Sequence, residues 1–582
     1  MSTYRDEFKR WLDEPSLSEA EINELKAIEG DEKQVEDRFY TELDFGTAGL
    51  RGVIGMGTNR MNDYVVRRAS AGLAACLKKI EGAAEKGVAV AYDSRRKSDR
   101  FAEITARTLA AYGVKVFLYS TLHSVPQLSF TVRELGCAAG VVITASHNPP
   151  EYNGYKVYWS HGGQIGPSRA KEILASIKSF GYFDTELMDF EDAKQKGLIK
   201  LIGKEIDEIY YEKTMSVMIN PDIVREMAPK MEGGIVYSPL HGSGLVPVTT
   251  ILERIGIKNL HVVKEQAEPN GDFPTVKAPN PEDPNAFKLA MELGKKVNAG
   301  MLFATDPDSD RLGVAVRVSD GEYRVLTGNQ IGCILIYYIL SELSEQDKLP
   351  FDGFVVKSIV STSLADAICY DFGVDIRHVL TGFRFIAEQI DFAEHYSGGK
   401  FLFGFEESYG FLAGGFAHDK DAVLAAMLVC EAAIVYASRG KGLMDVLDEI
   451  YEKYGYFIEK TKSYTLKGKE GLERIAGAMD SLKNDPPEVI GDGINVLIRE
   501  DYSTGVRVNC GCGLNTKIDL PRTNMLRYLL PHDGWLIMRP SGTEPKLKVY
   551  MSVFAHSQKT AEERIGKLEA GVDVLMGGLL GM

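Results

Sequence analysis

The stretch GVAVAYDSRRKSDRFAEITARTLAAYGVKVFLYS, residues 87–120, decides the fold class. It begins with a short apolar run, residues 87–93, of the kind that becomes a buried strand, and it ends with another, residues 114–120. Between them, residues 101–113 have the pattern of a helix. Strand, helix and strand at this spacing predict a βαβ unit and a largely buried sheet.

The same alternation continues along the chain. A further strand is expected at residues 140–144, others near Ile235, Leu260 and Met301, and a last set near Val355 and Phe401. We therefore predict three mixed α/β domains in a row, with bounds at residues 1–205, 206–325 and 326–458. Before the first sheet, residues 1–42 have the pattern of amphipathic helices. The glycine-rich segment 44–62 then predicts a loop, either a ligand loop or an irregular connection.

The pattern changes after about residue 459. Helices near Leu472 and Ala561 flank strands near Ile494, Leu536 and Val549, and KLKVYMSVF alternates polar with apolar residues. This alternation predicts a sheet that is exposed on one face. Residues 459–582 are therefore expected to form a smaller, separate α+β domain.

Composition narrows the class of protein. The 582 residues are 45% hydrophobic and 26% charged, with a formal net charge of −15. Phosphate-backbone binding depends on clustered Lys and Arg, so we expect no nucleic-acid partner. No run approaches the roughly 18 apolar residues of a membrane span, and the charged N-terminus offers no apolar signal segment. Seven cysteines without a CxxC pair indicate free thiols, so we expect a cytoplasmic protein.

The most specific motif is ATDPDSDRLG, residues 304–313. Asp306, Asp308 and Asp310 alternate on a short loop between two expected strands, where three carboxylates repel one another unless a cation is present. An all-oxygen ligand set suits a hard divalent ion such as Mg²⁺. The alternative is a solvated acidic turn, but three carboxylates followed by Arg311 favour the metal.

An EF-hand loop does not fit this motif. If Asp306 is position 1, the required Gly at position 6 is Arg311, and the required Glu at position 12 is Arg317. Three protein ligands also leave coordination positions open, as a catalytic metal requires.

Two other loops have residues that can bind a ligand, and each also has an ordinary structural interpretation. The first loop is RPSGTEPKLKVY, residues 539–550. A dianion can bind there to Arg539, to the Ser541 and Thr543 hydroxyls and to the backbone around Gly542. The alternative is a simple turn beside a surface Arg. In GFEESYG, residues 404–410, paired carboxylates can grip sugar hydroxyls, or Glu406 and Glu407 can open a helix.

Ser146 lies in GVVITASHNPPEYNGYKVYW, residues 140–159, where a strand ends and a loop begins. A hydroxyl there often only satisfies a turn. A hydrolase nucleophile does not fit, because His147 is the adjacent residue and the GxSxG elbow is absent. Together with a metal loop, a dianion cradle and a polyol-binding loop, a hydroxyl nucleophile indicates phosphoryl transfer to and from a sugar.

These loops also resemble a known family. TASHNPPEYNGYK, DPDSDRLG, GFEESYG and RPSGTEPK occur in the order and at about the spacing of the α-D-phosphohexomutase superfamily, and FGTAGLRGVIGMGTNRMN resembles its long phosphoglucomutase and phosphopentomutase branch. The resemblance covers essentially the whole chain. It implies a fold of three similar α/β domains and a smaller fourth around a central active-site cleft.

The resemblance also implies a set of functional residues. Ser146 would carry a phosphoryl group, and its phosphate oxygen would hold Mg²⁺ together with Asp306, Asp308 and Asp310. Arg51, Lys156 and His147 would act near the transferring phosphoryl, with Lys156 or His147 as general acid or base. The remaining matches are substrate-binding residues (Arg311, Thr381, Glu406, Ser408, Lys420) and distal-phosphate residues (Arg539, Ser541, Gly542, Thr543).

The resemblance implies an enzyme that interconverts glucose 1-phosphate and glucose 6-phosphate, with glucose 1,6-bisphosphate as intermediate and activator. A small-molecule sugar phosphate would be its partner, and the chain would be a monomer or a homodimer. Phosphopentomutase, phosphomannomutase and sugar bisphosphate synthase are alternatives, as is a non-catalytic sugar-phosphate or Ca²⁺-binding protein. One residue departs from the family pattern, because the usual Lys of the TGFK stretch is Arg384, which can change the preference among sugars.

Overall fold

The first expected strand, residues 87–93, becomes β2 (Val88–Tyr92) in the interior of a six-stranded sheet. The computed structural model describes residues 3–46, 49–231, 233–318, 321–466, 468–541 and 546–581. By its internal contacts the chain divides into two compact units. The first consists of residues 1–331 and 386–440, and the second of residues 332–385 and 441–582.

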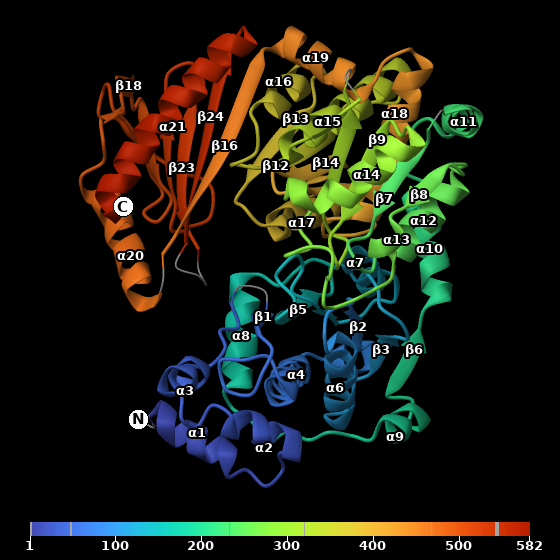
Figure 1. Ribbon diagram of the computed structural model, residues 1–582, viewed down its shortest axis with the longest axis vertical. Coiled ribbons are helices and arrows are strands. Elements are labelled where there is room, and N and C mark those ends of the chain that lie inside the picture. The colour runs from blue at the N-terminus through green and yellow to red at the C-terminus, as the bar shows by residue number, and fades with distance from the viewer. Residues whose placement is uncertain are drawn as a thin grey trace. The chain divides into compact units, whose positions relative to one another are not determined.

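The first sheet of unit 1 has the strand order β1-β5-β4-β2-β3-β6 (Figure 1). Strands β2, β3, β4 and β6 are parallel, whereas β5 runs antiparallel to both β4 and β1. The other five strands are β1 (Gly49–Val53), β3 (Val116–Tyr119), β4 (Ala139–Ile143), β5 (Tyr152–Trp159) and β6 (Ile199–Ile202). Because β2 and β4 are parallel neighbours, the segments that follow them emerge at the same edge of the sheet.

Helices cover this sheet, as its apolar strands require. Helices α6 and α7 both pack against β2 and β4, and α4 packs against α6 and α8. Ser124 caps α7 and exchanges hydrogen bonds with Gln127, which fixes where the helix begins. The helices of this part are α4 (Asp63–Leu77), α5 (Ala83–Lys86), α6 (Ser98–Ala111), α7 (Val125–Glu134), α8 (Pro167–Ile177) and α9 (Phe190–Gln195).

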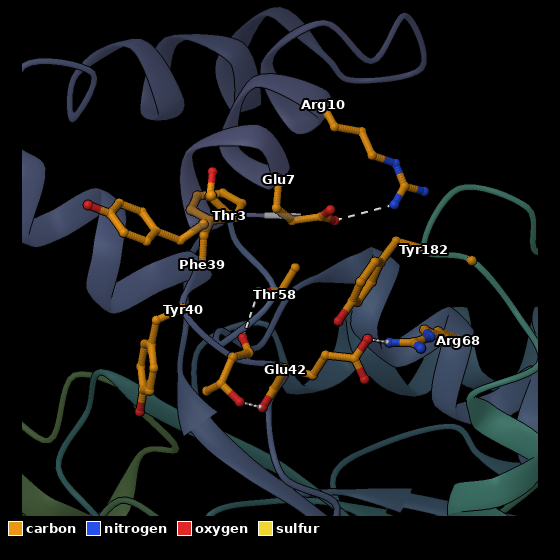
Figure 2. A pocket seen from close by; sticks show the side chains of 12 residues that line it. Thr3, Glu7, Arg10, Phe39, Tyr40, Glu42, Thr58, Arg68 and Tyr182 are labelled. Carbon is orange, nitrogen blue, oxygen red and sulfur yellow. Dashed lines mark hydrogen bonds and ion pairs between the residues drawn. The ribbon is translucent and has the colours of Figure 1, made fainter. Parts of the chain in front are cut away.

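Three N-terminal helices precede the sheet: α1 (Tyr4–Leu12), α2 (Glu19–Lys26) and α3 (Glu32–Phe39). Trp11 is fully buried, and its ring makes edge contacts with Phe39, Tyr64 and Tyr182. A hollow of about 300 Å³ lies beside these helices (Figure 2). An ion pair of 2.9 Å between Arg68 and Glu42 lies at its edge. None of the residues that line this hollow is a predicted site residue.

The second sheet of unit 1 has the strand order β11-β10-β9-β7-β8. Its strands are β7 (Ile235–Ser238), β8 (Leu260–Val262), β9 (Met301–Thr305), β10 (Leu312–Arg317) and β11 (Tyr323–Val325). Strands β7, β8 and β9 are parallel, and β10 returns antiparallel beside β9, so that residues 306–311 form a short turn. The helices are α10 (Lys204–Met215), α11 (Pro221–Met227), α12 (Leu245–Arg254), α13 (Lys264–Ala267) and α14 (Lys288–Val297).

Unit 1 also includes an antiparallel hairpin and an apolar helix. Strands β14 (Lys400–Glu406) and β15 (Gly410–Ala413) form the hairpin, and the helix is α18 (Ala422–Ser438). The Asp421 side chain caps α18 by accepting a hydrogen bond of 2.9 Å from the Leu424 N–H. Helix α18 packs against β15, and most of its residues are buried.

Unit 2 contains a parallel strand pair, β12 (Gly353–Ser358) with β13 (Asp375–Val379), and an antiparallel seven-stranded sheet, β16-β24-β23-β22-β19-β20-β21. The remaining strands are β16 (Tyr456–Thr465), β17 (Val489–Ile490), β18 (Ile494–Asn495), β19 (Ile498–Asp501), β20 (Val506–Asn509), β21 (Asn515–Lys517), β22 (Leu526–Leu529), β23 (Trp535–Pro540) and β24 (Lys546–Ala555). The helices of unit 2 are α16 (Leu364–Asp371), α19 (Leu443–Tyr454), α20 (Gly468–Asn484) and α21 (Gln558–Leu580). Helices α15 (Gly328–Glu345) and α17 (Phe383–Phe392) each have residues in both units.

The expected mixed α/β sheets and the C-terminal α+β sheet are confirmed. One expectation needs correction, because the glycine-rich segment 44–62 is not a loop throughout but contains β1. Gly49 has φ of 140°, and a Cβ there would lie 1.9 Å from the Tyr155 carbonyl oxygen, so only glycine allows β1 to approach β5 this closely. Over the described ranges no single helix meets the length and apolarity of a membrane span, although α18 and α19 do so as a bent pair.

Candidate active site

Two loops of unit 1 meet at the ends of buried strands. Ser146 follows β4 of the first sheet, and Asp306 follows β9 of the second. The Ser146 hydroxyl donates a hydrogen bond of 2.7 Å to Asp306 Oδ2, so the two motifs, 160 residues apart in sequence, form one site. Both side chains are buried, with Ser146 only 3% exposed.

The Ser146 backbone has an unusual conformation. Its φ is 51°, in the left-handed region that costs a non-glycine residue about 1 kcal/mol or more. The Ser146 N–H donates to Thr144 Oγ1 at 2.8 Å, and the Ser146 hydroxyl lies 3.2 Å from His147 Nδ1. The local hydrogen bonds therefore aim the hydroxyl at the carboxylates of the second sheet.

Asp306, Asp308 and Asp310 form a compact group of carboxylates. All three are buried, and one oxygen from each lies within 4.8 Å of the others. The Asp310 and Arg311 N–H groups each donate 3.1 Å hydrogen bonds to Asp306 Oδ1. These bonds close the turn and fix the first carboxylate relative to the other two.

The charge of this group fits a divalent cation. Burial, and then the neighbouring Asp308 and Asp310, raise the pKa of Asp306 well above its ordinary value. Asp308 Oδ1 and Asp310 Oδ1 are buried and have no hydrogen-bond partner among the described residues. A cation between the carboxylates would supply that partner and remove the repulsion, and hard oxygen ligands suit Mg²⁺.

Two lysines neutralise the outer oxygens of the group. Lys156, on β5, places its Nζ 2.8 Å from Asp308 Oδ2 and 3.7 Å from Asp310 Oδ2. Lys420 Nζ lies 3.0 Å from Asp310 Oδ2. Burial alone would raise the pKa of Asp308, but the Lys156 ammonium group lowers it below its ordinary value. The two oxygens that lack hydrogen-bond partners, Asp308 Oδ1 and Asp310 Oδ1, are thus not the ones that the lysines hold.

Lys420 is positioned by its own neighbours. Asp419 Oδ1 accepts from Lys420 Nζ at 3.1 Å, and Asp419 Oδ2 accepts from the Tyr158 hydroxyl of β5 at 2.7 Å. The Lys420 side chain also runs across Gly410, where a Cβ would lie 2.2 Å from Lys420 Cδ. Only glycine at the start of β15 leaves room for this lysine.

The GFEESYG motif is a hairpin turn. Glu406 ends β14, and residues 407–409 turn into β15, so the alternative in which Glu406 and Glu407 open a helix is wrong. Glu406 is buried. Burial alone would lower the pKa of Lys420, but the negative charges of Asp310, Asp419 and Glu406 together raise it. Ser408 lies in the turn itself.

The other predicted residues of unit 1 surround this centre. Arg51, on β1, donates a hydrogen bond of 3.3 Å to Asn148 Oδ1 of the Ser146 loop. Arg311 follows the carboxylates and makes an ion pair with Glu282. Burial, then the positive charges of Arg311 and Arg51, lower the pKa of His147 well below its ordinary value, which keeps its ring neutral.

The structure does not assign the remaining predicted residues to this centre. Thr381, Arg384, Arg539 and Ser541 belong to unit 2, and Gly542 and Thr543 lie outside the described residues. Thr381 Oγ1 is buried without a hydrogen-bond partner within the described part of the chain, and the Arg384 guanidinium lies 4.6 Å from the Phe385 ring centroid. The Ser541 N–H donates a hydrogen bond to the Lys546 carbonyl at 2.7 Å.

Sequence reasoning missed three residues that hold the site together: Asp93, Arg95 and Asp419. A signal for the first two was present, because they follow β2, whose carboxyl end lies beside that of β4 and therefore beside Ser146. Asp419 had no comparable signal, because its contact with Tyr158 joins positions 261 residues apart.

The chain was compared with protein families. The description "Phosphoglucomutase/phosphomannomutase, alpha/beta/alpha domain I" matches residues 42–181, and those of domains II and III match residues 209–320 and 327–454. The C-terminal domain of the same family matches residues 517–564. These four ranges lie inside the four domains predicted from the sequence.

The chain was also compared with individual proteins. A phosphoglucomutase of Staphylococcus saprophyticus is 35% identical over 93% of this chain and 96% of its own, and one of Staphylococcus haemolyticus is 36% identical over 89% and 91%. The crystal structure of pp63/parafusin from Paramecium shares the fold, with a TM-score of 0.69 at 16% identity over 93% of this chain and 97% of that one. The chain therefore belongs to the phosphoglucomutase/phosphomannomutase family, within the α-D-phosphohexomutase superfamily.

Proposed function

We propose that this protein is a phosphoglucomutase that interconverts glucose 1-phosphate and glucose 6-phosphate. The observation that carries the proposal is the 2.7 Å hydrogen bond from the Ser146 hydroxyl to Asp306 in a buried group of three carboxylates. A turn residue needs no such partner, whereas a phosphoryl carrier needs a cation site at its oxygen. The Staphylococcus relatives, named phosphoglucomutase, support glucose phosphate as the substrate.

In the proposed reaction, Ser146 Oγ carries a phosphoryl group at rest and transfers it to the free hydroxyl of the sugar phosphate. The resulting glucose 1,6-bisphosphate reorients and returns its other phosphoryl group to Ser146. Asp306, Asp308 and Asp310, with an oxygen of the phosphorylated Ser146, would hold Mg²⁺. When bound, this ion supplies positive charge that stabilises the transferring phosphoryl group.

Other side chains of unit 1 supply further positive charge and groups that can accept or donate a proton. Lys156 Nζ, 2.8 Å from Asp308, adds positive charge beside the transferring group, as Arg51 does from β1. His147, neutral and 3.2 Å from Ser146 Oγ, is placed to hold the hydroxyl proton between transfers, and Lys156 is the other candidate for that role. A proton must leave the sugar hydroxyl as the phosphoryl arrives, and one must reach Ser146 Oγ as its phosphoryl departs.

The binding roles of the remaining residues rest on their positions in the family motifs. We propose that the sugar is bound by Arg311, Thr381, Glu406, Ser408 and Lys420. We propose that the distal phosphate is bound by Arg539, Ser541, Gly542 and Thr543. The charge of Lys420, held between Asp310 and Asp419, supports the first assignment. We also propose a cytoplasmic monomer or homodimer, and the seven free cysteines support that location.

The test is a coupled assay that follows glucose 6-phosphate formation from glucose 1-phosphate with Mg²⁺ and a trace of glucose 1,6-bisphosphate. Mannose and ribose phosphates are compared under the same conditions, together with intact-mass measurement of the enzyme. We expect turnover with glucose phosphate and one phosphoryl adduct, both lost in Ser146→Ala and both kept in Ser179→Ala at an exposed serine. Full activity in Ser146→Ala contradicts the proposal, as does stoichiometric consumption of a separate phosphoryl donor.

A further inference from the structure

Arg95 lies directly beneath the loop that carries Ser146. It follows β2 by three residues, and its guanidinium is completely buried. Nε donates to the Ser146 carbonyl at 3.1 Å, and Nη1 donates to the Pro149 and Tyr152 carbonyls at 2.9 and 3.1 Å. Nη2 donates to the Ser146 and Asn148 carbonyls. The five N–H groups of this side chain are therefore all directed at backbone oxygens of residues 146–152.

Arg95 is itself held on two sides. Asp93 lies 3.4 Å from its Nε, and the Asp93 carboxylate is fixed by the Thr144 and Ser98 hydroxyls at 2.6 and 2.7 Å. On the other side, the guanidinium lies 5.0 Å from the ring centroid of Phe273. A buried, paired and stacked arginine of this kind has little freedom to move.

These contacts do not leave Arg95 available to bind a phosphate. A phosphate-binding arginine turns a fork of two N–H groups toward the anion, but here every donor is already used by the main chain. The Ser146 carbonyl, which receives two of these bonds, belongs to the residue with φ of 51°. Arg95 thus stabilises the one backbone orientation that directs Ser146 Oγ to Asp306.

We propose that Arg95 is a positioning residue for phosphoryl transfer, which acts by clamping the backbone of residues 146–152 so that Ser146 Oγ stays at the carboxylates. This inference rests on the proposed function of Ser146. Lysine cannot replace the clamp, because its three donors extend from a single nitrogen and cannot reach four carbonyls spread over seven residues.

The test compares Arg95→Lys with Arg96→Lys. Arg96 is the matched control, because its half-exposed side chain pairs with Asp272. For each variant, kcat and KM for glucose 1-phosphate are measured with Mg²⁺, together with hydrogen–deuterium exchange of peptides spanning residues 146–152. Melting curves report the folded fraction, so that kcat is expressed per folded molecule.

We expect Arg95→Lys to lower kcat about 100-fold with little change in KM, because a displaced nucleophile loses alignment while the sugar contacts stay in place. Exchange of residues 146–152 should quicken in this variant alone. Wild-type kcat in Arg95→Lys overturns the inference, and so does an equal loss in Arg96→Lys. A purely structural role would lower the folded fraction and leave kcat per folded molecule and the KM-to-kcat relation unchanged.

A second variant covers the case in which Arg95→Lys does not fold. Phe273→Leu removes the stacked ring but keeps every hydrogen bond of Arg95, so we expect a several-fold fall in kcat and faster exchange of residues 146–152. Unchanged kcat and unchanged exchange in Phe273→Leu contradict the clamp. If the wild type lacks mutase activity, the proposed function fails, and the exchange comparison still decides whether Arg95 orders the loop.

Discussion

At Ser146, the backbone and the side chain are held by different parts of the fold. The backbone is fixed by Thr144 and by the carbonyl contacts of Arg95, which belong to the first sheet. The hydroxyl reaches Asp306, which belongs to the second sheet. The reactive atom thus lies where two sheets meet within unit 1, and a change in either one alters its position.

At the residue scale, we expect Asp308→Asn to lower turnover about 100-fold, because it removes a charged oxygen from the proposed cation site. Its stability should change little, because the substitution also relieves repulsion with Asp306, and Lys156 keeps Asp310 at 3.7 Å. Steady-state kinetics at several Mg²⁺ concentrations and a melting curve measure the two effects. Asp222→Asn, whose carboxylate is 90% exposed, is the control. Unfolding of Asp308→Asn at ordinary temperature would indicate a structural ion instead.

Local motifs made part of this site predictable from sequence. Asp306, Asp308 and Asp310 alternate within five residues of the chain, so their spacing alone indicated a cation, and Ser146 was found through its strand end. Arg95 was not found, because its place after β2 was the only signal of it, and its role consists of contacts with backbone oxygens 51–57 residues away. Thr381 and Arg539 were identified through family motifs only, and their roles stay predictions.

At the scale of elements, the start of α18 carries an unusual cap. Asp421 is fully buried, accepts from the Leu424 N–H at 2.9 Å, and receives the Tyr210 hydroxyl at 2.9 Å. Burial raises its pKa to about 6, so the folded protein binds this proton more tightly than the unfolded chain does. The stability that protonated Asp421 contributes is therefore fully present below about pH 4, the pKa of this carboxyl in the unfolded chain. It is lost as the pH rises through 6, its pKa in the folded protein.

Asp421→Asn keeps an oxygen for the cap but removes this titration. We expect the free energy of unfolding of the variant, relative to wild type, to increase by about 1 kcal/mol between pH 5 and pH 8. Urea unfolding of both proteins at the two pH values measures the difference. The matching substitution at the exposed cap of α3, Asp31→Asn, is the control. A difference that stays constant or falls with rising pH would show that Asp421 is ionised in the folded protein throughout.

Regular elements were the easiest part of the fold to predict. The βαβ pattern of residues 87–120 appeared as β2, α6 and β3, because apolar runs and helical periodicity are local properties. Strand β1 was not expected, since GLRGV has two glycines and little β propensity. It exists because its backbone pairs with β5, and that pairing is a property of the assembled sheet.

At the scale of the whole molecule, one predicted domain contributes residues to both compact units. Residues 326–458 are divided between them, and part of this segment packs into the core of unit 2. There Ile359, Val360 and Leu380 lie in one apolar cluster with Trp535 and Tyr550. A repeating strand–helix pattern predicts elements, but which elements share a core depends on contacts between distant side chains.

The proposed cation site should give the two units different responses to Mg²⁺. Asp306, Asp308 and Asp310 all belong to unit 1, so ion binding should stabilise that unit, by about 2.7 kcal/mol at 100 times the dissociation constant. Differential scanning calorimetry in Mg²⁺ and in EDTA should show an upward shift of one transition, and exchange of peptides from residues 489–529 should not change. Asp308→Asn should remove the shift. Equal protection of both units would contradict this assignment.

The cysteines allow a chemical use of the chain that is independent of its enzymology. Five are buried, whereas Cys510 and Cys512 are exposed at the turn between β20 and β21. A maleimide dye or a spin label applied to the folded protein would therefore attach at the tip of one hairpin in unit 2. Replacing either cysteine with serine leaves a single attachment point, from which fluorescence or electron paramagnetic resonance can follow the motion of that hairpin during turnover.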